Sequence, residues 1–339
     1  MCRMRKPDDP SVRRDTSRNV AALGRDGPQV SRIGLGLAAI GRPAYITTNR
    51  AADLGGDRSM DVLCELTWHV LDAAYASGVR YIDAARSYGS AEAFLGGWLA
   101  RGSEVSDVVV GSKWGYTYVG GWEMAAPVQE VKDLSLATFE RQYAETRALL
   151  GEHLGLYQVH SLTIESGAMG DQALLGALAR RREEGLMLGI TTTGPGQGDT
   201  IRRALEVRVD GAHLFSSVQA TWNLLEPSAG PALNEASAAG WAVIVKEAVA
   251  NGRLTSAGDA GGDGSPLGGA AAAAGTTPDA LAIAAALAQP WVSVVLSGAA
   301  SVDQLMSNLR ALDVAAVELP DLAEHPDAYW AERSARPWT

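Results

Sequence analysis

Apolar residues along the chain form two alternating patterns. Short apolar runs typical of strands alternate with longer stretches in which apolar positions recur at helical spacing. The predicted strands cover 30–37, 79–84, 108–112, 156–160, 187–191, 214–219, 242–246 and 292–296. The predicted helices cover 60–77, 91–101, 136–150, 172–184, 200–206, 231–239, 278–288 and 302–312. Strict alternation of this kind indicates a parallel sheet.

The number of repeats favours one fold class. Eight strand–helix units over roughly 300 residues fit a closed (β/α)8 TIM barrel, which needs about 250 residues plus insertions. We therefore predict a single α/β domain over residues 28–339. The rival is an open doubly wound sheet with a second domain. Gly34-Leu35-Gly36 comes close to a dinucleotide-binding turn but lacks its third glycine, which weakens that rival.

Two segments lie outside this pattern. Residues 1–27 are polar and charged, and we predict a flexible N-terminal tail. Arg13-Arg14 resembles a twin-arginine export signal, but the apolar patch at 20–23 is shorter than a signal sequence requires. Residues 251–277 are dominated by Gly and Ala and have too few large apolar groups to form a core of their own. We predict a mobile loop there, either a lid or a disordered insertion.

Composition and charge exclude several function classes. The net charge is −10 and the pI about 5.1, so the chain lacks the basic footprint of a nucleic-acid-binding protein. Cys2 and Cys64 lie far apart and form no metal or redox pattern, which suits a reducing cytoplasm. No apolar run approaches the roughly 20 residues of a membrane span. We expect a cytoplasmic protein without a metal site, a nucleic-acid partner or a membrane anchor.

Four polar residues follow the second, third and fourth predicted strands. Asp83, Lys113 and His160 end these strands, and Tyr88 lies in the loop after the second. Because the carboxyl ends of barrel strands converge on one face, all four should surround one pocket. Each alone is more often structural. Together they suit protonation of an oxygen that gains negative charge, as when hydride reaches a carbonyl carbon.

The charges of these groups suggest a role for each. We predict that Lys113 lowers the pKa of Tyr88 from its usual value of about 10 by stabilising the phenolate. Asp83 would keep Lys113 protonated and oriented. His160 would donate a hydrogen bond to the substrate oxygen and position it against Tyr88.

Six motifs resemble the aldo-keto reductase family over nearly the whole chain after the tail. They are Ile82-Asp83-Ala84-Ala85-Arg86-Ser87-Tyr88-Gly89-Ser90-Ala91-Glu92, Gly111-Ser112-Lys113, Gln158-Val159-His160-Ser161, Leu188-Gly189-Ile190-Thr191, the segment 218–225 and the segment 297–308. The resemblance implies a (β/α)8 barrel, NADPH-dependent carbonyl reduction and a catalytic tetrad of Asp83, Tyr88, Lys113 and His160.

The same resemblance implies a set of cofactor-binding residues. Thr191, Thr192 and Gln219 would contact the nicotinamide carboxamide, and Lys246 stands where some members stack a tyrosine on the nicotinamide ring. Ser297, Gly298, Gln304 and Asn308 would bind the adenosine phosphates, and 251–277 occupies the place where relatives fold a segment over the pyrophosphate. NADP is the implied cofactor. NAD is possible, because the positive residues that hold a 2′-phosphate are missing from 297–310 apart from Arg310.

Several points stay open at this level. Among the aromatic residues, Trp114 and Trp222 are the predicted contacts for a small-molecule carbonyl substrate, whose identity and physiological direction of turnover the sequence does not give. An NADPH-binding regulatory or accessory subunit with the same barrel is the alternative function. A weaker one is a barrel isomerase or lyase with a phosphate site after strands seven and eight. The oligomeric state is also open.

Overall fold

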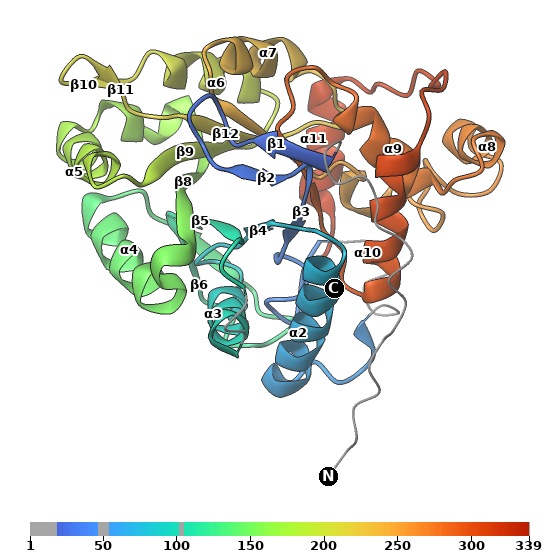
Figure 1. The fold of residues 1–339 in the computed structure, drawn as a ribbon, viewed down its shortest axis with the longest axis horizontal. Helices are drawn as coiled ribbons and strands as arrows, with labels where there is room; N and C mark the ends of the chain where they lie inside the picture. The colour runs from blue at the N-terminus through green and yellow to red at the C-terminus, as the bar shows by residue number, and fades with distance from the viewer. Residues whose placement is uncertain (1–18, 47–53, 102–104, 339) are drawn as a thin grey trace.

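Eight parallel strands close into a barrel in the computed structural model, which describes residues 19–46, 54–101 and 105–338 (Figure 1). The strands are β3 (Ile33–Gly36), β4 (Tyr81–Asp83), β5 (Val109–Trp114), β8 (Leu154–Leu162), β9 (Met187–Thr192), β12 (Ser217–Thr221), β13 (Ala242–Lys246) and β14 (Val294–Ser297). The last strand pairs with the first, Val295 lying beside Ile33. The predicted (β/α)8 barrel is therefore confirmed.

Helices surround the barrel and connect successive strands, as Figure 1 shows. They are α2 (Met60–Ala76), α3 (Ala91–Arg101), α4 (Leu136–Leu150), α5 (Gln172–Glu183), α6 (Gln197–Leu205), α7 (Gly230–Ala238), α9 (Pro278–Leu287) and α10 (Val302–Leu309). Side-chain caps fix where several begin: Ser135 accepts from the Thr138 amide, and Asp171 accepts from two amides of α5. These helices match the sequence prediction closely because their apolar faces pack on the barrel.

Short elements fill the connections. Single 3-10 turns are η2 (Gly151–His153), η3 (Ile164–Ser166), η4 (Ala168–Gly170), η5 (Ala250–Gly252) and η6 (Arg310–Asp313). Antiparallel pairs are β6 (Tyr116–Tyr118) with β7 (Glu130–Lys132), and β10 (Arg208–Val209) with β11 (Ala212–His213). The β6–β7 hairpin lies between β5 and α4 and brings Glu130 back toward the barrel mouth.

A hairpin at the start of the described chain covers the amino end of the barrel. β1 (Val20–Ala22) pairs with β2 (Gln29–Ser31), and Leu23 between them is fully buried among barrel-interior side chains. The amide of Arg25 donates to the carbonyl of Gly240. The prediction of a flexible tail over 1–27 is therefore wrong for residues 20–27, because Leu23 anchors them. Residues 1–18 lie outside the described residues.

The Gly/Ala-rich segment 251–277 contains a helix, α8 (Pro266–Ala273), capped by Ser265. Leu254, Leu267 and Ala271 are buried and share a cluster with Tyr329 and Trp330. The last two belong to α11 (Pro326–Ala335), a helix that the sequence did not predict. The expectation that 251–277 has no core of its own is corrected, because the C-terminal segment supplies the missing large apolar groups.

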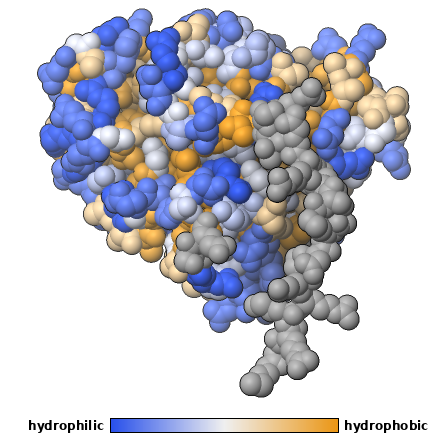
Figure 2. Space-filling model, in the orientation of Figure 1, coloured by the Kyte–Doolittle hydropathy of each residue, from blue (hydrophilic) through white to orange (hydrophobic). Residues whose placement is uncertain are grey.

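The surface is mixed in character. Figure 2 shows polar residues over most of one face, with apolar areas between them. Within the described ranges, no single helix has both the length and the apolar character to cross a membrane. The pair α8 and α9 meets the length and composition together, but the two helices are bent by 85°.

Candidate active site

A cavity of about 660 Å³ opens where the carboxyl ends of the barrel strands meet. Its wall includes groups from the barrel, the β6–β7 hairpin and the C-terminal segment. Asp83, Tyr88 and His160 line one part, and Ser297, Gln304 and Asn308 line another. One continuous cavity therefore joins the predicted catalytic residues to the segment after β14.

Lys113 and Asp83 form a buried ion pair at the floor of this cavity. Lys113 Nζ contacts Asp83 Oδ1 and donates to the Ala84 carbonyl at 2.9 Å. Gln219 Nε2 donates to the second oxygen of Asp83 at 2.8 Å. Burial raises the pKa of Asp83, while Lys113 and the Gln219 amide oppose that rise. The Asp83 carboxylate on β4 thus connects to Lys113 of β5 and to Gln219 of β12.

Tyr88 is placed by a tight turn after β4. The next residue, Gly89, has a φ of 59°, and a Cβ there would lie 2.5 Å from the Gly41 carbonyl oxygen. Glycine is therefore required beside Tyr88. The turn sets the Tyr88 ring with its centroid 4.7 Å from Lys113 Nζ and 5.6 Å from the His160 ring. All four predicted catalytic residues meet in one place.

The charge balance at Tyr88 differs from the sequence prediction. Burial, followed by the Asp83 carboxylate, raises the pKa of Tyr88 well above its usual value, and Arg42 opposes this rise. In the free protein the pKa of Tyr88 is therefore raised and not lowered as predicted, mainly because the side chain is buried. Tyr88 is protonated at neutral pH.

His160 is buried close to several cationic and aromatic side chains. Burial, with Lys113, Lys246 and Arg42, lowers the pKa of His160 well below 6.5, so the imidazole is neutral at pH 7. The Ser87 hydroxyl lies 3.5 Å from Nδ1, and the Tyr116 ring centroid lies 5.0 Å from the His160 ring centroid. If Nδ1 accepts from Ser87, Nε2 carries the proton and can donate it.

Arg42 is a buried cation at this site that the sequence reasoning missed. Its guanidinium lies 5.3 Å from the Tyr88 ring centroid and 4.5 Å from that of Trp338. It donates to the Ser87 carbonyl and to Glu130 Oε2, both at 2.9 Å. No short motif joins residues 42, 130 and 338, so only the folded chain reveals this cluster.

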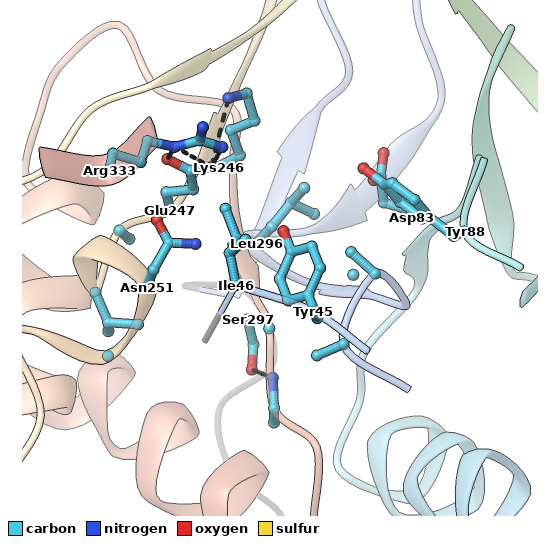
Figure 3. A pocket seen from close by; sticks show the side chains of 18 of the residues that line it. Tyr45, Ile46, Asp83, Tyr88, Lys246, Glu247, Asn251, Leu296, Ser297 and Arg333 are labelled. Atoms are coloured by element: carbon cyan, nitrogen blue, oxygen red, sulfur yellow. Dashed lines mark hydrogen bonds and ion pairs between the residues drawn. The ribbon is translucent and has the colours of Figure 1, made fainter. Parts of the chain in front are cut away.

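A second charged cluster lies where β13 ends (Figure 3). Arg333 of α11 donates to Glu247 at 2.9 Å, and Lys246 Nζ lies 3.9 Å from the same carboxylate. Burial lowers the pKa of Lys246 to about 8, against the opposing effect of Glu247. Arg333 and Lys246 hold the pKa of Glu247 at about 2 despite its burial. α11 thus contributes a charged group to the cavity wall.

Comparisons with known proteins agree with this geometry. The sequence profile described as "Aldo/keto reductase family" matches residues 32–321, well over half of the chain. The chain belongs to the aldo-keto reductase family. Membership in this family makes it an oxidoreductase acting on carbonyl groups or alcohols.

Solved aldo-keto reductase structures share the fold at low identity. A putative aldo-keto reductase from Pseudomonas aeruginosa has 23% identity and a TM-score of 0.61, over 87% of this chain and 94% of that one. The holo form of an aldo-keto reductase from Bacillus halodurans has 20% identity and a TM-score of 0.65, over 93% and 96%. A glycerol dehydrogenase from Gluconobacter oxydans has 21% identity and a TM-score of 0.66, over 95% and 96%. No protein in the curated set matches the chain significantly.

Most of the cofactor-binding residues implied by the aldo-keto reductase motifs line the cavity. They are Thr191, Gln219, Lys246, Ser297, Gly298, Gln304 and Asn308. Thr192 is a correction: it is fully buried, and Thr193 lines the cavity instead. Because side chains alternate along a strand, Thr192 faces away from the barrel interior that Thr191 faces.

The two predicted substrate contacts are also corrected. Trp114 is fully buried, and its ring centroid lies 5.0 Å from that of Phe139 of α4. Trp222 packs with Trp291, their centroids 5.8 Å apart. Neither lines the cavity. Trp114 follows Lys113 on β5, so it faces the helices while Lys113 faces the interior. The aromatic residues that line the cavity in the described part of the chain are Tyr45, Tyr88, Tyr116 and Trp338.

Proposed function

We propose that this protein transfers hydride between a nicotinamide dinucleotide and a small aldehyde, ketone or alcohol, with Tyr88 exchanging the proton. One observation carries the proposal. Tyr88, His160 and the Lys113–Asp83 pair meet at one end of a single cavity that also reaches Ser297 and Asn308. A nicotinamide cofactor supplies the hydride when bound. We further propose that the enzyme is cytoplasmic.

The chain's own residues would handle the proton. Tyr88, protonated at neutral pH, gives its O–H proton to the carbonyl oxygen as that oxygen gains negative charge. Lys113 and Arg42, both close to the Tyr88 ring, stabilise the phenolate that remains. Neutral His160 donates a hydrogen bond to the same oxygen and holds the substrate in line. Asp83 holds Lys113 in place through their ion pair.

The cavity fits a dinucleotide. Its volume lies within the range of small-molecule sites. Thr191 and Gln219 present polar groups beside the catalytic end. Gly298 leaves open space at the other end, where an added Cβ would have no atom within 4 Å. Lys246 and Arg333 place positive charge in the wall, which suits the phosphates.

The test follows oxidation of reduced cofactor with a panel of aldehydes, ketones and quinones. Tyr88→Phe should lower kcat/KM by about 100-fold or more, since general acid catalysis contributes at least that much. Tyr116→Phe is the matched control, because Tyr116 also contacts His160 but should keep most of the activity. Unchanged turnover in Tyr88→Phe would refute the proposed role. Tight cofactor binding without turnover on any substrate would favour an accessory subunit instead.

A further inference from the structure

We infer that the end of the cavity formed by Ser297–Asn308 selects a dinucleotide without a 2′-phosphate, so that the enzyme prefers NADH to NADPH. This inference rests on the proposed function and extends it to the choice of cofactor. A 2′-phosphate carries nearly two negative charges and is held by Arg or Lys in proteins. A ribose 2′-hydroxyl is instead held by a carboxylate.

The described residues that line this end carry no positive charge. They are Ser297, Gly298, Ala299, Asp303, Gln304, Ser307, Asn308 and Asp279. The two ionisable groups among them are carboxylates: Asp303 lies in the first turn of α10, and Asp279 in the first turn of α9. A phosphate placed here would meet two like charges and no cation from these segments.

Asp279 is held in place by Asn308, one of the residues predicted to bind the adenosine phosphates. Asn308 is best oriented with its NH₂ group 2.8 Å from Asp279 Oδ2 and its carbonyl oxygen accepting from the Ser297 hydroxyl at 2.8 Å. Asp279 is only 9% exposed. The Asp279 carboxylate is thus fixed in the cavity wall, because one of its oxygens accepts from Asn308 while the group still lines the cavity.

The cations of the cavity belong to other clusters and have carboxylate partners. Arg42 pairs with Glu130, Arg333 and Lys246 with Glu247, and Arg336 with Glu332. Figure 3 shows Arg333 and Lys246 together, apart from Ser297 in the view. Arg310, the basic residue just after α10, donates to the Gly275 carbonyl and does not line the cavity.

Binding measurements test the inference without relying on turnover. Quenching of tryptophan fluorescence should give a dissociation constant for NADH roughly tenfold or more below that for NADPH, at low ionic strength. Asp303→Asn should tighten NADPH about three-fold or more and so narrow the preference for NADH. Asp199→Asn is the control, because it removes the same charge from the first turn of α6, whose residues do not line the cavity.

A gain of function makes the test sharper. Gly298→Lys combined with Asp303→Arg should move the preference toward NADPH, because Gly298 has open space for a side chain and Asp303 is exposed. Equal or tighter binding of NADPH by the wild type would overturn the inference while leaving the proposed oxidoreductase intact. Binding of neither dinucleotide would overturn both.

Discussion

The guanidinium of Arg42 lies 5.3 Å from the centroid of the Tyr88 ring and is fixed there by Glu130 and the Ser87 carbonyl. Tyr88 therefore lies near two cations, Arg42 and Lys113. Lys113 is balanced by Asp83, and Arg42 by Glu130. The site keeps a proton donor neutral while providing charge for the phenolate that forms.

We expect Arg42→Met to lower kcat/KM about tenfold, because it removes a cation near the phenolate and leaves Glu130 without this partner. The double variant Arg42→Met/Glu130→Gln should recover part of the loss, since the uncompensated carboxylate is gone. Steady-state kinetics on all variants, with circular dichroism to check folding, provide the measurement. Equal kcat/KM in wild type and Arg42→Met would show that this contact is only structural.

His160 should make stability sensitive to acid. Its pKa in the folded state lies well below 6.5. Just below pH 6.5 the His160 imidazole therefore stays neutral in the folded protein, whereas in the unfolded chain it takes up a proton. The free energy of unfolding must then fall as pH drops below about 6.5, by up to about 1.4 kcal/mol per pH unit. Urea unfolding at pH 7.5, 6.5 and 5.5 should show a shallower decline for His160→Gln. The exposed His69→Gln should follow the wild type, and a His160→Gln slope identical to wild type would contradict this account.

Lys246 should make cofactor binding depend on pH in the alkaline range. Its pKa is about 8 in the free protein, so the ammonium that faces the cavity is lost as pH rises through that value. Between pH 7 and 9.5 the dissociation constant for NADH should rise roughly tenfold. Lys246→Met should bind weakly with little pH dependence in this range, whereas Lys246→Arg, which stays charged, should bind tightly throughout. Wild-type pH dependence in Lys246→Met would assign the titration to another group.

Gly111 and Tyr81 should be energetically coupled inside the barrel. A Cβ on Gly111 would lie 2.1 Å from the Tyr81 hydroxyl oxygen, which is buried without a hydrogen-bond partner among the described residues. Gly111→Ala should cost about 1–3 kcal/mol of unfolding free energy, and less in a Tyr81→Phe background. Tyr81→Phe alone should be neutral or stabilising. Gly176→Ala, in the open environment of α5, is the control and should cost nothing. Denaturant unfolding compares the two single variants, the double variant and this control. Additive costs for Gly111→Ala and Tyr81→Phe would contradict the coupling.

The barrel and the meeting point of the four polar residues could be predicted from sequence because both depend on local periodicity. Apolar spacing located the eight strands, and in a barrel every strand end lies on the same face. α8 and α11 were missed because their apolar residues form a joint cluster from positions far apart in the sequence, as Leu267 and Trp330 do. No window of the sequence contains that cluster.

The electrostatics of the site were less predictable than its position. Lys113 lies near Tyr88 as expected, but the sign of the pKa shift at Tyr88 depends on burial and on how strongly Asp83 balances Lys113. Arg42, Glu130 and Arg333 reach the cavity from three distant segments. Trp114 failed for a simpler reason, since one residue along a strand reverses the direction of the side chain, and Trp222, just after β12, packs against Trp291 instead.

The hairpin that carries Leu23 closes the amino end of the barrel. With the amino end of the barrel filled, ligands must come and go through the carboxyl-end mouth. Under the proposed function, the dinucleotide and the substrate would therefore enter and leave through the same opening.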